Sequence, residues 1–163
     1  MELRLRILLS LACLLLALPA PAGRAQAQGA MTEEKAIAVI AALDRAARAG
    51  KVGDIAPLLA DEVQFKVIVE VAGTRQEIEM DREKFISQTR SAFAKRIAYE
   101  SKRHKTQVTI SKDGQRAMIT SELFEKVTRR EGTLSAISSE IYILRLRGGK
   151  IVVTSYDATV RPV

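Results

Sequence analysis

The C-terminal stretch 133–163 decides the fold: it consists of TLSAISSEIYILRLR, then GG, then KIVVTSYDATVRPV. Two runs rich in Ile, Val, Thr and Tyr flank the pair Gly148-Gly149. β-Branched and aromatic residues favour strands, and a Gly-Gly pair between two such runs is typical of a tight hairpin turn. The stretch therefore predicts a hairpin of two long strands, which the preceding chain extends with further strands and covers with helices.

The first 27 residues have the pattern of a secretory signal peptide. A basic segment around Arg4 precedes the apolar run 7–18, and Ala25 and Ala27 supply small residues before the expected cleavage site. The apolar run is shorter than the roughly 20 residues that a bilayer span requires. We expect cleavage after Ala27, which leaves a periplasmic or secreted domain, residues 28–163, with no stable membrane span.

Composition excludes several classes of function for this domain. It contains no Cys, since Cys13 lies in the apolar run, and His104 is the only His of the chain. Disulfides, thiol catalysis and Cys-ligated zinc are excluded, and a His-based metal site or a Ser-His-Asp triad is disfavoured. We therefore expect no metal and no cofactor. The chain carries a net charge of +7 but no Trp and no alternation of aromatic with cationic residues, so nucleic acid is not an expected partner.

The chain before the hairpin contains the signals of three helices. Thr32 can cap a run of apolar residues at helical spacing, and Gly50 ends that run. Asp54 and Asp81 can cap two further helices. These signals predict helices over residues 33–49, 55–59 and 82–98.

Alternating apolar and polar residues, interrupted by Gly-containing turns, fill most of the remaining chain. They predict strands over residues 63–71, 74–80, 99–111, 115–128, 133–147 and 150–160. Because strands and helices are grouped rather than strictly alternating, the fold class is α+β. We expect a curved, mostly antiparallel six-stranded sheet with three helices on its concave face.

Four short passages give the chain a recognisable family pattern. They are Gly53-Asp54-Ile55, the sequence LLADEVQF at 58–65, the sequence DREKFI at 81–86 and the sequence LRLRGGKIV at 144–152. Their order and spacing resemble the nuclear-transport-factor-2-like superfamily, which includes SnoaL-like cyclases and ketosteroid-isomerase-like enzymes. The resemblance implies a cone-shaped, cystatin-like roll, a pocket between the helices and the concave sheet, and dimers that pack through the sheet.

The resemblance also allows a residue-by-residue test for isomerase chemistry. The general base of the steroid isomerases falls at Val67, and their first-helix Tyr falls near Val39 or Ile40. Their pocket Asp falls near Tyr142, whose hydroxyl could still stabilise an oxyanion. Without a base at Val67 no group removes the proton, so this chemistry is disfavoured and catalysis of another kind stays open.

Two polar residues of the hairpin, Glu140 and Tyr142, share one face of their strand. If this face lines the pocket, Tyr142 is a hydrogen-bond donor and Glu140 a base or anchor whose pKa desolvation would raise. The alternative is that this face meets solvent or a dimer partner, because Ile137, Ile141 and Ile143 occupy the other face.

A second carboxylate, Glu122, also lies in mid-strand. It could join Glu140 as an acid/base pair if both side chains reach the pocket. Alternatively, each carboxylate pairs with a cation on a neighbouring strand, such as Lys102, Arg103 or Lys105.

The adjacent residues Tyr156 and Asp157 point to opposite faces of the last strand, so one of them can reach the pocket. Tyr99 ends the third helix and could close the pocket mouth or pack beneath it. The candidate pocket residues are Val67, Tyr99, Glu122, Glu140, Tyr142, Tyr156 and Asp157.

Two classes of function remain at this point. The first is non-catalytic: the domain binds a small apolar or amphipathic ligand in the pocket, or acts as an interaction module that forms a homodimer through its sheet. The second is an enzyme of the cyclase or dehydratase type whose acid/base residues lie on the C-terminal hairpin.

Overall fold

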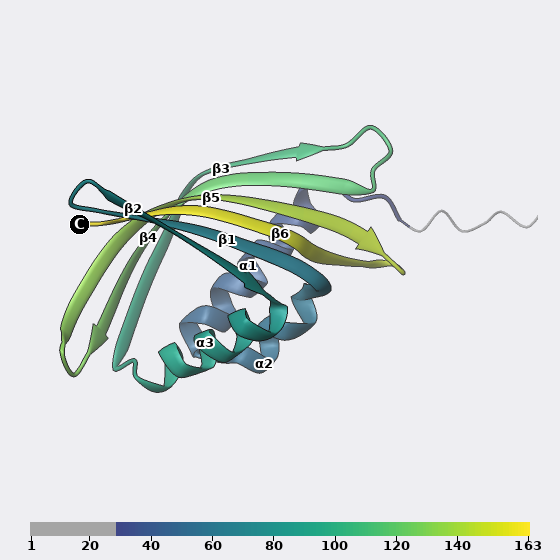
Figure 1. Cartoon of the computed structure of the whole chain (residues 1–163). Coiled ribbons are helices and arrows are strands. Elements are labelled where there is room, and N and C mark those ends of the chain that lie inside the picture. Colours follow the sequence, from purple (N-terminus) through teal and green to yellow (C-terminus); the bar gives the residue numbers. More distant parts are fainter. Residues whose placement is uncertain (1–28) are drawn as a thin grey trace, which may run out of the picture.

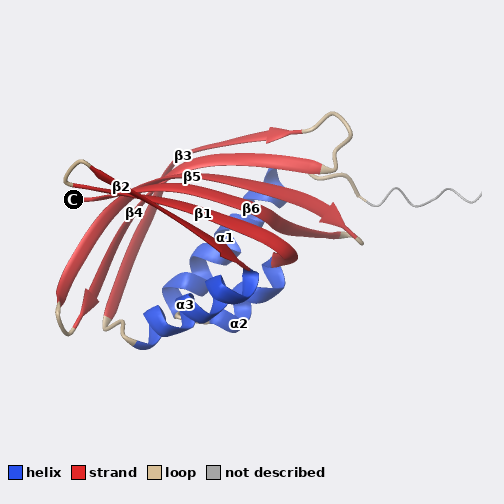
Figure 2. Cartoon of the chain, in the orientation of Figure 1, coloured by secondary structure: helices blue, strands red, loops and turns tan. Residues whose placement is uncertain are grey.

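The computed structural model describes residues 29–163, which form one curved sheet with helices on its concave side (Figures 1 and 2). The expected signal peptide lies outside the described residues. The helical elements are α1 (Glu33–Ala49), α2 (Val52–Ile55), the 3-10 turn η1 (Ala56–Leu58) and α3 (Arg82–Ala94). The strands are β1 (Leu59–Val71), β2 (Thr74–Asp81), β3 (Ala98–Ile110), β4 (Arg116–Arg129), β5 (Gly132–Arg147) and β6 (Lys150–Pro162).

The C-terminal hairpin β5–β6 lies at the centre of the sheet, whose strand order is β2-β1-β6-β5-β4-β3. β1 pairs with β6 in parallel, and all the other neighbours are antiparallel. The predicted fold class is therefore confirmed: α+β, with a six-stranded and mostly antiparallel sheet. The strands are strongly bent, and the helices lie on the inner side of the bend (Figure 1).

Helix α1 begins and ends where the sequence predicts. The Thr32 side chain accepts a hydrogen bond from the Lys35 amide at 3.3 Å, which satisfies one of the free N–H groups of the first turn. At the other end, Gly50 adopts a φ of 70°, a left-handed conformation that Gly takes at little cost. Both ends are thus fixed by local chemistry.

Helix α3 ends four residues earlier than the predicted boundary at residue 98, since its last residue is Ala94. The Asp81 cap is as predicted, with its carboxylate accepting from the Lys84 amide at 2.8 Å. Beyond Ala94, however, the Ile97 amide donates to the Thr128 carbonyl at 2.8 Å, so the chain already joins the sheet. Tyr99 therefore lies on β3 and does not end a helix.

The short second helix also differs from the prediction of 55–59. The helix begins at Val52, and Asp54 lies inside its first turn instead of capping it. Pro57 lies in η1, and Leu59 is already the first residue of β1, paired with Val153. As at the end of α3, residues whose local propensity favours a helix pair with the sheet instead.

A β-bulge interrupts the pairing of β3 with β4. The register shifts between His104 and Gln107, and Lys105 has a φ of 50°, which is uncommon for a residue with a side chain. Bulges bend a strand and redirect its side chains. This one lies immediately after Arg103, the residue on which the site described below depends.

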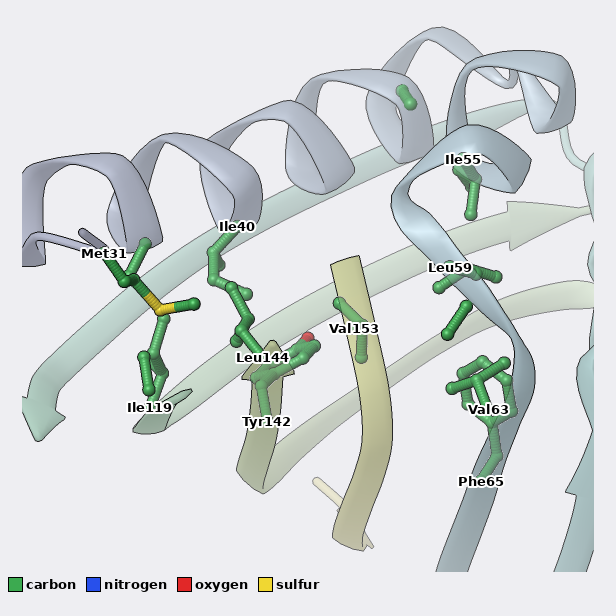
Figure 3. Packing of buried hydrophobic residues seen from close by; sticks show 14 of the residues in the cluster. Met31, Ile40, Ile55, Leu59, Val63, Phe65, Ile119, Tyr142, Leu144 and Val153 are labelled. Atoms are coloured by element: carbon green, nitrogen blue, oxygen red, sulfur yellow. The ribbon is translucent and has the colours of Figure 1, made fainter. Parts of the chain in front are cut away.

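The hydrophobic core fills the space between α1 and the concave face (Figure 3). Its most deeply buried large side chains come from four strands: Val63 of β1, Ile119 of β4, Leu144 of β5 and Val153 of β6. Ile40 of α1 extends down toward them (Figure 3). The core lies at one end of the concave face, and beyond it the same face carries polar residues.

Candidate functional site

The polar part of the concave face borders a cavity of about 290 Å³ between α1, α3 and the sheet. Most of the lining is apolar, and the rings of Phe65 and Phe85 stack on one another at 3.9 Å between centroids. The apolar lining residues include Leu43, Ile55, Leu59, Phe65, Phe85, Ala92, Phe93, Leu123, Val127 and Val153. The volume is at the lower end of the range for sites that bind small molecules.

A cluster of charged residues centred on Arg103 forms the polar wall of this cavity. Arg103 holds Asp44 of α1 in a two-pronged salt bridge, with Nε to Oδ2 at 2.9 Å and Nη2 to Oδ1 at 2.7 Å. Its Nη1 forms a second salt bridge with Glu140 and also donates to the Ser121 hydroxyl. The Arg103 guanidinium therefore joins β3, α1, β4 and β5.

Glu140 is buried, with 3% of its surface exposed, and both of its carboxylate oxygens accept hydrogen bonds. Oε1 accepts from the Tyr156 hydroxyl at 2.7 Å, and Oε2 accepts from the Tyr142 hydroxyl at 3.2 Å and from Arg103. Burial and the charge of Glu140 raise the pKa of Tyr142 well above its usual value. Burial, Tyr142 and Glu140 likewise raise the pKa of Tyr156. Both hydroxyls thus stay protonated donors at neutral pH.

A further carboxylate, Glu125 of β4, also lines the cavity and so lies on the same face of the sheet as Glu140. The Tyr99 hydroxyl donates to its Oε1. Burial raises the pKa of Glu125, an effect that outweighs the lowering by this hydrogen bond. Burial and the neighbouring Glu125 carboxyl raise the pKa of Tyr99 in turn. Glu125 therefore takes up a proton more readily than an ordinary Glu side chain.

The structure brings four of the candidate residues together on the cavity wall: Tyr99, Glu140, Tyr142 and Tyr156. Val67 packs beside the hydrophobic core and is absent from the cavity lining. The alternative that the Glu140 face meets solvent or a dimer partner is wrong, since Ile137 and Ile141 on the opposite face of β5 are each 40% exposed on the outer, convex side. The polar face of β5 is thus the inner one.

The other two candidates, Glu122 and Asp157, lie on the convex face. Glu122 follows Ser121, whose hydroxyl reaches Arg103 on the inner side, so alternation turns Glu122 outward. There it pairs with Lys105 at 2.9 Å. Asp157 pairs in register with Ile141 of the same outer face. No carboxylate pair of Glu122 with Glu140 is formed; each has its own cation, as the alternative interpretation expected.

Sequence reasoning missed five charged residues of the cavity wall: Asp44, Arg96, Arg103, Glu125 and Arg129. Arg103 belongs to a basic run, 102–105, that is typical of a solvated strand edge. The available signal was the strand alternation, which places Arg103 on the same face as Tyr99. For Asp44 the signal was its place beside the apolar stripe of α1 that contains Ile40.

Two further features concern residues 29–163 only. No group of three or more His, Cys, Asp or Glu side chains in this range is arranged to hold a metal ion. None of the helices in this range is long and apolar enough to span a membrane.

No family model and no curated protein matches this sequence. Several solved structures are nevertheless similar in fold. A protein from Caulobacter vibrioides with a cystatin-like fold has a TM-score of 0.61 at 14% identity, over 78% of this chain and 87% of that one. A Streptomyces avermitilis protein, proposed to be a dehydratase of the NTF2-like family, has a TM-score of 0.61 at 14% identity, over 80% and 94%. The chain has the nuclear-transport-factor-2-like fold.

A third structure shows that proteins of this fold serve as subunits of larger assemblies. It is the beta subunit of a proposed aromatic-ring-hydroxylating dioxygenase from Novosphingobium aromaticivorans, with a TM-score of 0.64 at 13% identity, over 80% of this chain and 89% of that one. Identities this low establish the nuclear-transport-factor-2-like fold alone, because one fold carries many functions.

The buried salt bridges of Arg103 give a first prediction. Replacing Arg103 with Met leaves Asp44 and Glu140 without their cation, so we expect the free energy of unfolding to fall by about 3 kcal/mol or more. Lys105→Met is the matched control, because the Lys105–Glu122 pair is solvent-exposed and worth less than about 1 kcal/mol. Urea denaturation measures both values. Equal losses in the two variants would show that the Arg103 cluster does not hold the fold.

The raised pKa of Glu125 gives a second prediction. A carboxyl whose pKa is higher in the folded state contributes stability below its unfolded pKa, and this contribution is lost as pH rises through the folded pKa. Glu125→Gln should therefore be more stable than the wild type at neutral pH, and this advantage should shrink as the pH falls toward 4.5, the ordinary Glu value.

Denaturation at a series of pH values measures this difference. Glu122→Gln, on the convex face, should show no comparable dependence on pH. An advantage of Glu125→Gln that grows at low pH would contradict the assignment.

Proposed function

We propose that the protein binds a small amphipathic ligand in the cavity under α1 and α3 and does so without catalysis. One observation carries the proposal: the cavity has an apolar body, while the charges on its deep wall are already paired with one another. An apolar ligand can therefore be buried against this wall without separating a charged group from its partner, which is the arrangement typical of binding pockets.

The arrangement of Glu140 supports a non-catalytic role. Its oxygens already accept hydrogen bonds from Arg103, Tyr142 and Tyr156, so a substrate proton would have to compete with these three donors for the carboxylate. Val67, at the position of the isomerase base, carries no ionisable group and lies outside the cavity lining. The hairpin residues are suited to holding the wall of a binding site in place.

An enzyme of the dehydratase type is the second candidate, and Glu125 is the observation that favours it. Its raised pKa and its hydrogen bond from Tyr99 would suit a general acid or base in the cavity. The similarity to the Streptomyces avermitilis protein fits this alternative. Under it, Glu125→Gln abolishes turnover of any substrate found for the protein, whereas unchanged turnover removes Glu125 from the chemistry.

The convex face is our proposed site of homodimer formation. Met118, Ile137 and Ile141 are each at least 40% exposed on it, next to polar residues of neighbouring strands. An exposed apolar patch on a sheet is typical of an interaction surface. Light scattering after size-exclusion chromatography tests this assignment: Ile141→Glu should give a folded monomer, and an unchanged mass would remove the face from the interface.

Export remains part of the proposal on the strength of the N-terminal pattern. N-terminal sequencing of the protein expressed in a bacterium should find a chain that begins near Gln28. A mature chain that begins at Met1 would contradict cleavage.

Ligand binding is tested by filling the cavity. N-phenyl-naphthylamine is a neutral, apolar fluorophore whose emission rises on burial, and we expect the wild type to bind it. Ala92→Phe places a ring in the cavity and should reduce the affinity at least tenfold. Ala94→Phe, on the exposed side of the same helix, is the matched control and should bind as the wild type does.

Circular dichroism would first establish that both variants are folded. Absence of binding to the wild type, or equal binding to the two variants, would contradict a ligand site in this cavity.

A further inference from the structure

Arg103, Arg96 and Arg129 supply guanidinium groups to the cavity wall, and the three groups are used differently. Arg103 is neutralised by two carboxylates. Arg96 instead donates to the carbonyls of Ala47 and Arg48 in the last turn of α1, at 2.7 and 3.1 Å. It also lies against the Phe93 and Tyr99 rings, at 4.5 and 4.6 Å from their centroids. Arg96 is thus held rigidly but has no carboxylate partner among residues 29–163.

Arg129 has no hydrogen-bond acceptor for its buried Nε among the described residues, and it forms no salt bridge within them. It is the last residue of β4 and lines the cavity. A buried donor on a charged group without a partner is costly, and in native proteins such a group needs an explanation. A ligand that supplies the missing acceptor would be one.

Arg96 and Arg129 lie at the same end of the cavity. The amide of Ile97, the residue after Arg96, donates to the carbonyl of Thr128, the residue before Arg129. The nearest inward-facing carboxyl on β4, Glu125, is already bonded to Tyr99, and burial raises its pKa, which favours its neutral form. This end of the cavity therefore carries two guanidinium groups that form no salt bridge among the described residues.

We propose that the ligand is a monocarboxylate with an apolar body, and that Arg129 binds its carboxylate head with support from the charge of Arg96. The proposal rests on the proposed function, because it requires that the cavity binds a ligand. The guanidinium fork matches the two oxygens of a carboxylate. The apolar body would then extend between the helices toward Phe93, Phe85 and Phe65. One unpaired donor group beside an apolar cavity of about 290 Å³ fits a small ligand with a single negative charge.

The test compares two ligands of nearly equal size and shape that differ in charge: naphthalene carboxylate and its primary amide. Each is titrated in competition with N-phenyl-naphthylamine. In the wild type we expect the carboxylate to bind at least about tenfold more tightly than the amide, because one charge-assisted hydrogen bond contributes that much affinity. Arg129→Gln should abolish this preference. Arg130→Gln, which changes the exposed neighbour in the turn, should retain it.

Equal affinity of the wild type for the acid and the amide would overturn the proposal, as would a preference that persists in Arg129→Gln. Arg129→Lys keeps the charge and should keep part of the preference for the carboxylate. It replaces Arg129→Gln as the test if that variant does not fold. Complete loss of the preference in a folded Arg129→Lys would also contradict a charge-based site. The neutral fluorophore separates the two claims. If it binds while the acid has no advantage, only the carboxylate site fails; if it does not bind, the ligand-binding function fails as well.

Discussion

The salt bridges of Arg103 are the interaction on which this structure depends. A guanidinium from β3 contacts a carboxylate of α1 and a carboxylate of β5, all largely removed from water. Burying a charge is costly, and the cost is offset only when partners and hydrogen bonds are complete. Here they are: two carboxylates, one serine and two tyrosines complete the cluster. Helix α1 is therefore attached to the sheet at a defined position, and the cavity stays open beside the attachment.

This closed cluster determines which residues are left for function. The charged groups on the deep wall, around Arg103, are paired with one another. This part of the cavity therefore provides apolar contact surface and few groups that could react with a ligand. Toward the end of β4, by contrast, burial raises the pKa of Glu125, and Arg129 has a buried donor without a partner among the described residues. The cavity wall therefore differs along β4. The charged groups near Ser121 are paired with one another, whereas Arg129 at the end of the strand has no partner among the described residues.

Most of the fold could be predicted because local rules fix it. Helix 33–49 has a cap at each end, and the central hairpin has its Gly-Gly turn. The end of α3 could not be predicted, because the Ile97 amide pairs with a carbonyl some thirty residues away in sequence. Alternation shows that Tyr156 and Asp157 face opposite ways, but only the completed sheet shows which face is concave.

Arg103 was the least predictable residue of the site. Its neighbours Lys102, His104 and Lys105 are polar, so composition does not separate it from a solvated edge. Strand alternation assigns it to the face of Tyr99 but does not show that this face is buried. Its burial follows from three elements meeting over one position of β3, next to the bulge at Lys105. Such a position is defined by tertiary structure and not by any sequence window.

A crystal structure of the protein with N-phenyl-naphthylamine would show whether the Arg103 cluster is a fixed support and the apolar cavity the binding site. We expect electron density for the fluorophore between Phe65 and Phe93, with the contacts of Arg103 to Asp44 and Glu140 unchanged. Density on the convex face alone, or a ligand that separates Arg103 from Glu140, would contradict it.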